Sequence, residues 1–205
     1  MNQAQLATSS LDEETARAEL YGLLSALYYA PPSIEMHDNL KVAVTEAPAP
    51  GAVLQESWTA LVASAREYSL PDIEREYNVL FGGVGKPDVY LFGSHYLSGF
   101  LNEKPLAELR TDIAALGLAR DEALPETEDH VAWLCEVMRY LIAGDDVSVA
   151  NLTRQHEFFA KHIQPWLADM CEAVIRHPAA RFYAALATFT LTFVTVEAQG
   201  FDMLV

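Results

Sequence analysis

Apolar residues recur at steps of three and four along nearly the whole chain, and this spacing places side chains on one face of an α-helix. No stretch alternates apolar and polar residues in the way that a half-buried β-strand does. Prolines and glycines separate the periodic segments. The two clearest segments carry Leu20, Leu23, Leu24 and Leu27, and Val131, Leu134, Met138, Leu141 and Ile142. The sequence therefore predicts an all-α, single-domain bundle of about nine helices.

The helical domain is expected to cover residues 10–205. Ser10-Leu-Asp-Glu13 has the form of a capping box, which marks a helix start, so residues 1–9 are expected to be a disordered tail. Helical periodicity fails between residues 82 and 104, where glycines and a proline are mixed with aromatic and branched side chains. A loop of this length is usually functional or folded against its own domain. We therefore predict a long glycine-rich loop near the middle of the chain, with a hinge within 82–104.

The charge balance argues against two classes of partner. Acidic residues number 29 against 13 basic ones, which gives the 205-residue chain a formal net charge of −16 at pH 7. Nucleic acids and anionic membrane surfaces are bound mainly through lysine and arginine. We therefore expect no nucleic-acid partner, whereas a basic peptide is compatible with this charge.

Three further observations favour a cytoplasmic protein without membrane insertion. The N-terminus lacks the basic and apolar regions of a secretory signal. The longest uncharged stretch, Phe182–Val196, is shorter than the roughly 20 residues that a membrane helix needs. Cys135 and Cys171 lie far apart within helical segments, so we expect buried free thiols rather than a disulfide.

Patterns typical of enzymes and metal sites are incomplete in this chain. Gly83-Val-Gly-Lys86 lacks both the earlier glycine and the following serine or threonine of a phosphate-binding loop. His156-Glu157 begins like a zinc-protease helix, but Ala160 stands where the second histidine belongs. Ser94-His95 has no identifiable third group for nucleophilic catalysis. The sequence thus predicts neither an enzyme nor a metal site.

An acidic segment precedes the most regular helical pattern. Glu126, Glu128 and Asp129 crowd the expected helix start, with Thr127 as an N-cap and His130 directly after them. Carboxylates are stabilising near the positive end of a helix dipole, whereas an imidazolium is not. The segment is therefore either a well-capped helix start or a polar surface site held rigidly at a helix end, and local chemistry does not decide between the two.

Four stretches of the chain carry a family likeness when they are taken together. They are Tyr28-Tyr-Ala-Pro31, Glu76-Tyr-Asn-Val-Leu-Phe-Gly-Gly83, Glu126-Thr-Glu-Asp-His130, and Phe158-Phe-Ala-Lys-His-Ile-Gln-Pro-Trp166 followed by Phe182-Tyr-Ala-Ala-Leu-Ala187. Their order and separations resemble the TorD/DmsD family of cytoplasmic chaperones, which is related to the NarJ group. The likeness covers most of the chain.

The resemblance implies an all-helical, non-enzymatic protein that assists the maturation of a molybdopterin-dependent redox enzyme. Such a chaperone is expected to bind the apoenzyme, its twin-arginine signal peptide, or both, before cofactor insertion and export. It is expected to hold no cofactor stably. Weak binding of a guanine nucleotide or of the molybdopterin cofactor, with a direct part in cofactor delivery, is the alternative. Both a monomer and a domain-swapped dimer are compatible with the family.

The resemblance also implies where the peptide binds. The family's peptide-binding positions fall here on Tyr28, Tyr77, Leu80, Phe81, Tyr96, Asp129 and His130. Glu126 and Glu128 add carboxylates that suit the arginines of a signal peptide. Secondary candidates are Phe92, His162 and Trp166. Thr127 stands where the family often has proline, but it can cap the helix, so the acidic cluster is expected to be kept. The loop, which reads Asp88-Val-Tyr-Leu-Phe-Gly-Ser94, also departs from the family pattern, so peptide specificity is expected to differ.

The client enzyme is not fixed by these residues. The Gly82–Leu101 loop is vaguely similar to that of chaperones encoded beside formate dehydrogenases, which makes formate dehydrogenase our preferred client. Dimethyl sulfoxide reductase and trimethylamine N-oxide reductase are the alternatives.

Overall fold

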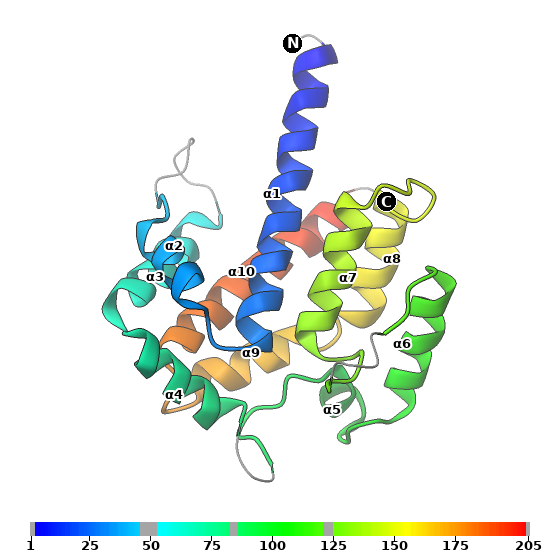
Figure 1. Cartoon of the computed structure of the whole chain (residues 1–205). Coiled ribbons are helices and arrows are strands. Elements are labelled where there is room, and N and C mark those ends of the chain that lie inside the picture. Colours follow the sequence, from blue (N-terminus) through cyan, green and yellow to red (C-terminus); the bar gives the residue numbers. More distant parts are fainter. Residues whose placement is uncertain (1–2, 46–52, 83–85, 121–124, 204–205) are drawn as a thin grey trace. The chain divides into compact units, whose positions relative to one another are not determined.

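The computed structural model describes residues 3–45, 53–82, 86–120 and 125–203, with side chains from residue 13 onward. These residues form ten α-helices and no β-strand, so the predicted all-α class is confirmed (Figure 1). The helices are α1 (Gln3–Tyr29), α2 (Ile34–Val42), α3 (Gln55–Glu67), α4 (Leu70–Leu80), α5 (Gly93–Ser98), α6 (Lys104–Ala115), α7 (Val131–Ala143), α8 (Leu152–His162), α9 (Leu167–Arg176) and α10 (Phe182–Asp202). None of these helices combines the length and apolar character that a membrane crossing requires.

At the N-terminus and in the predicted glycine-rich loop, the helices differ from the sequence predictions. Helix α1 begins at Gln3, so residues 3–9 are helical rather than part of a disordered tail, and Ser10 lies inside the helix instead of capping it. The predicted loop at 82–104 contains the short helix α5, which ends at Gly99 with φ of 81°. A helix of six residues is too short to produce a periodic pattern, and the glycines at its two ends, Gly93 and Gly99, concealed it. Residues 83–85 of the predicted hinge lie outside the described part of the chain.

The chain forms two compact units, each made from two separate segments. Unit 1 combines Met1–Tyr29 with Phe92–Pro165, and unit 2 combines Ala30–Leu91 with Trp166–Val205. Helical periodicity reports which face of a helix is buried but not which distant helix covers that face. The division into units therefore could not be read from the sequence.

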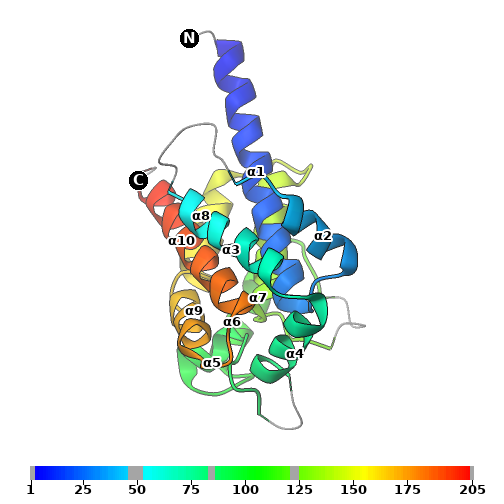
Figure 2. The ribbon, with the colours of Figure 1, turned by 90° about the vertical axis from the view of Figure 1, so that its left-hand side faces the viewer.

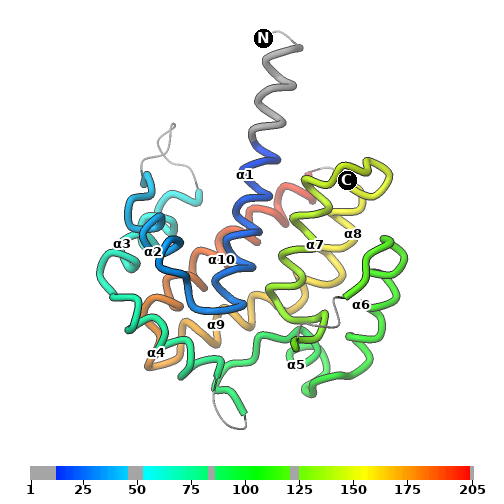
Figure 3. The backbone as a smooth tube through the Cα atoms, viewed as in Figure 1, coloured from blue at the N-terminus to red at the C-terminus, as the bar shows by residue number. Residues whose placement is uncertain are grey.

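Unit 1 is organised around the pair of helices α1 and α7. Helix α7 packs against α1 along one side and against α8 along another, and α5 packs against α6 (Figure 3). Eight of the thirteen residues of α7 are buried, because its apolar positions recur at steps of three and four. The acidic segment, residues 126–129, directly precedes this central helix.

Unit 2 is built around helix α10, which contacts α3, α4 and α9 (Figure 2). The first N–H groups of a helix have no partner within the helix itself. Here the buried carboxylate of Glu76 on α4 accepts hydrogen bonds from the backbone N–H groups of Arg181 (2.7 Å), Phe182 (3.1 Å) and Tyr183 (2.8 Å). One side chain thereby caps α10 from more than 100 residues away in the sequence.

Removal of this carboxylate is expected to destabilise the protein. In Glu76→Ala, the buried N–H groups of Phe182 and Tyr183 and the part-buried N–H of Arg181 lose their carboxylate acceptor, and we expect the free energy of unfolding to fall by about 3 kcal/mol. Urea denaturation followed by circular dichroism measures this change. The matched control is Glu74→Ala, which removes an exposed carboxylate from the same helix and should change stability by less than about 0.5 kcal/mol. Equal stability of the two variants would contradict the capping role.

Candidate functional site

Asp129 fastens the start of helix α5 to the start of helix α7. Its Oδ2 accepts a hydrogen bond from the Ser94 N–H (2.9 Å), and its backbone oxygen accepts one from the Gly93 N–H (2.9 Å). The Thr127 hydroxyl donates to the other carboxylate oxygen, Oδ1 (2.6 Å). Asp129 is only 3% exposed. Its carboxylate therefore organises the backbone of unit 1 and does not project into solvent.

Glu128 is also turned inward, where it meets a cation from α6. The Arg110 guanidinium donates through Nε to both carboxylate oxygens (3.0 Å each) and lies within 2.9 Å of Oε2 through Nη2. Burial alone would raise the pKa of Glu128, but the hydrogen bonds and charge of Arg110 outweigh burial and lower this pKa below its ordinary value. Glu126, by contrast, is partly exposed and sits at the outer end of the acidic segment.

His130, and not Thr127 as the sequence predicted, is the N-cap of α7, and it is buried among aromatic rings. Its Nδ1 accepts a hydrogen bond from the Ala132 N–H (3.1 Å), which requires an unprotonated nitrogen at that position. The rings of Phe92 and Tyr29 pack edge-on against it, with centroids at 5.0 and 6.4 Å. Burial lowers the pKa of His130 to about 4, against a smaller opposing effect of the Asp129 carboxylate. The histidine is therefore neutral at physiological pH.

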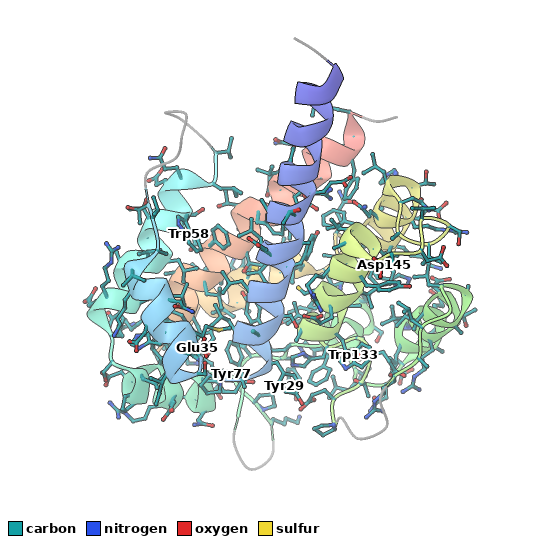
Figure 4. The ribbon with its side chains drawn as sticks, turned by 45° about the horizontal axis from the view of Figure 1, so that its top comes forward. Tyr29, Glu35, Trp58, Tyr77, Trp133 and Asp145 are labelled. Carbon is teal, nitrogen blue, oxygen red and sulfur yellow. The ribbon has the colours of Figure 1, made fainter. Side chains whose placement is uncertain are left out.

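An apolar pocket of about 290 Å³ lies beside this cluster, between α1 and α7. Tyr29 and Trp133 contribute aromatic rings to it, and Figure 4 labels both residues. Ser25, Ala132 and Glu136 complete the lining, which consists almost wholly of apolar atoms. Tyr29 is 40% exposed, so one wall of the pocket is open to solvent. A pocket of this character suits one or two apolar side chains of a partner.

The remaining predicted residues of unit 1 lie apart from this pocket. Tyr28 is fully buried at the end of α1, and Tyr96 on α5 packs its ring against His95 with centroids 5.0 Å apart. His162 on α8 is buried and bonds to Asp112 on α6 (2.7 Å between Nε2 and Oδ2). The structure thus brings Phe92, Asp129 and His130 together but places His162 in a different part of the unit.

The other predicted residues belong to unit 2. Tyr77 and Phe81 form an aromatic cluster with Tyr183, with ring centroids between 5.1 and 5.6 Å apart. Leu80 and Trp166 are buried. Tyr77 and Phe81 are therefore the partly exposed members of the set in this unit.

Comparison with known proteins places the chain in a family. Residues 48–172, more than half of the chain, match the model of the nitrate reductase delta subunit family. The chain belongs to this family. The matched range contains the acidic segment, Asp129 and His130, and helices α3 to α8.

Comparison with individual proteins finds relatives that are named chaperone protein TorD. The chain is 25% identical to the chaperone protein TorD of Aliivibrio fischeri over 89% of its own length and 93% of the relative. It is 27% identical to TorD of Shewanella loihica over 90% of its length and 92% of that protein. A shorter match to TorD of Vibrio cholerae is 28% identical and covers 52% of this chain and 51% of the relative. The chain is therefore a redox-enzyme maturation chaperone of the TorD type and not an enzyme, as the sequence predicted.

The geometry also adds residues that sequence reasoning missed. Arg110 could not be found, because its partner Glu128 is 18 positions away and on a different element. Tyr29, rather than its predicted neighbour Tyr28, is the tyrosine at the pocket. Trp133 left a signal that went unused, since a large aromatic ring outside the buried stripe of an amphipathic helix often marks a contact surface. Among the described residues, no group of three or more His, Cys, Asp and Glu side chains could hold a metal ion.

The buried histidine makes stability depend on pH in a defined window. Its folded-state pKa of about 4 lies below the ordinary 6.5, so between these values the unfolded chain binds a proton that the folded chain excludes. The unprotonated His130 therefore contributes about 3 kcal/mol to the free energy of unfolding. This contribution is complete above pH 6.5 and is lost as the pH falls toward 4. In His130→Asn the amide still caps α7, and we expect a flatter dependence of unfolding free energy on pH in this window.

Urea denaturation at a series of pH values measures this difference, with His156→Asn on α8 as the matched control. Other groups also titrate in this range, so the quantity of interest is the difference between each variant and the parent protein. An NMR titration of the His130 ring provides the direct test. A midpoint near 6.5 in the folded protein would overturn the assignment of a buried neutral histidine.

Proposed function

We propose that this chaperone binds the twin-arginine signal peptide of a molybdopterin-dependent redox enzyme in the cytoplasm, and retains the apoenzyme until its cofactor is inserted. The observation that carries the proposal is the apolar pocket of Tyr29 and Trp133, which is open to solvent and has the acidic residue Glu136 in its lining. A twin-arginine signal joins a basic segment to an apolar one. The pocket and this acid offer a complement to both parts.

The apolar part of the peptide is proposed to enter the pocket itself. Tyr29 and Trp133 provide two aromatic walls, and Ala132 leaves space between them because its side chain is small. Aromatic residues in partly open pockets contribute strongly to binding because they bury a large area with little loss of conformational freedom. The pocket is formed by α1 and α7, which pack extensively against each other, so its walls are held in place before a peptide arrives.

The arginines are proposed to meet the carboxylate of Glu136. Arg139 donates to Glu136 through Nε and Nη2, and both bonds go to the same oxygen, Oε2 (2.8 Å each). Among the described residues the other oxygen, Oε1, accepts no hydrogen bond, so it is free to accept one from a guanidinium. Glu126, which is partly exposed, adds a further acid, whereas Glu128 and Asp129 support this surface from within.

The pocket is tested by truncating its open wall. Tyr29→Ala should weaken the binding of a synthetic peptide, carrying a twin-arginine motif and an apolar segment, by roughly tenfold or more, because one aromatic wall is lost. Isothermal titration calorimetry measures the affinity. The matched control is Tyr140→Ala, which truncates a tyrosine of similar exposure (37% against 40%) on α7 outside the pocket. If both variants bind as tightly as the parent, this pocket is not the peptide site.

The charge recognition is tested by a double-mutant cycle across the interface. Glu136→Gln should weaken the binding of the parent peptide by about 1 kcal/mol. The same substitution should have little effect on the binding of a peptide whose two arginines are replaced by glutamine. Glu172→Gln in unit 2, which also lies in an exposed pair with an arginine, is the matched control. Equal losses for both peptides would show that Glu136 does not face the arginines.

A further inference from the structure

A second cavity, of about 370 Å³, lies in unit 1 between helices α6 and α8 and shares no residue with the apolar pocket. Its lining is mixed. Polar and charged groups come from both helices, and apolar side chains lie between them. The lining residues are Asp112, Ala115 and Leu116 on the α6 side, and Arg154, Glu157, Phe158, Lys161 and His162 on the α8 side.

The α8 side has charges at both ends and an apolar centre. Arg154, Phe158 and Lys161 follow one another at steps of four and three, which places them on one face of the helix. The two cations are separated by seven residues, or about 10 Å along the helix axis. Leu116 and Phe158 therefore provide apolar surface between charged ends.

The end of the cavity near Asp112 retains an unused acceptor. Lys161 Nζ (2.5 Å) and His162 Nε2 (2.7 Å) both bond to the same carboxylate oxygen, Oδ2. Burial would raise the pKa of Asp112, but these two partners reverse that effect and lower it, so the carboxylate is ionised at neutral pH. Among the described residues, Oδ1 of Asp112 has no partner, and it is free to accept a bond from a cationic group.

The opposite end retains unused donors. Arg154 donates through Nη1 to Glu157 Oε2 (3.0 Å), and among the described residues this is its single side-chain bond. A guanidinium has five N–H donors, so the others remain available to a carboxylate. Because each cation of the cavity is matched by an acid, the cavity has no net charge with His162 neutral. It therefore suits a dipolar guest better than a simple anion or cation.

We propose that this cavity binds a small zwitterion with an apolar part, the chemistry of an apolar α-amino acid or of an apolar dipeptide. The ligand carboxylate pairs with Arg154, its ammonium group pairs with Asp112, and its apolar portion lies against Phe158 and Leu116. The cavity falls within the size range, about 300–1,000 Å³, that is usual for small-ligand sites.

The experiment compares three related probes on the full chain by amide NMR titration at millimolar concentration. L-Leucine should shift resonances of α6 and α8. N-acetyl-L-leucine, which lacks the ammonium charge, and L-leucinamide, which lacks the carboxylate, should each bind about tenfold more weakly. Leucylglycine distinguishes the two sources of this chemistry, because tighter binding of the dipeptide assigns the site to a peptide and tighter binding of leucine assigns it to the free amino acid.

Arg154→Gln should weaken L-leucine binding by about tenfold without loss of folding, because Arg154 is half exposed and its removal leaves no buried group unpaired. Arg75→Gln is the matched control, since Arg75 also pairs with an acid three residues away on an exposed helix face, but in unit 2. Thermal unfolding verifies that both variants are folded. Absence of shifts with L-leucine, equal binding of all three leucine probes, or unchanged affinity in Arg154→Gln would each overturn the proposal.

Discussion

Helix starts that are buried inside a folded unit need hydrogen-bond acceptors, and in both units of this protein a carboxylate from a distant segment provides them. Glu76 caps α10 in unit 2, and Asp129 holds the start of α5 in unit 1. Each of these helix starts is positioned by the carboxylate that accepts its backbone N–H groups. The packing of the aromatic cluster around Tyr183 and of the ring of Phe92 depends on these two interactions, because both lie directly beside the capped ends.

The all-α class can be predicted from the sequence, because a helix that buries one face has apolar residues at steps of three and four. Nine of the ten described helices carry that pattern, and α5 does not, since glycine and serine fill its buried positions. The division into two units left no such pattern, because α1 meets α7 across about a hundred residues of intervening chain. Periodicity defines faces, and only the folded chain shows which faces meet.

The candidate site was predictable in its location but not in its orientation. Three acids beside a histidine at a helix start indicated either a cap or a surface site, and the structure shows a cap for Asp129 and His130. The choice depended on whether backbone N–H groups of α5 would reach Asp129, and α5 itself was not predicted. Tyr29 was overlooked for a similar reason, since adjacent residues of a helix point about 100° apart and the family resemblance indicated Tyr28.

The internal use of Asp129 and Glu128 changes how an acidic chaperone can recognise a basic peptide. A carboxylate that already accepts backbone or guanidinium hydrogen bonds gains little from one more cation, and its removal would loosen the helix start that it caps. In the proposed complex, discrimination for arginine would have to come from acids with an unused oxygen at the surface, and Glu136 is such an acid among the residues that line the aromatic pocket. The buried acids have a structural role instead. They position the start of α7, and α7 forms one wall of the pocket against which a peptide would pack.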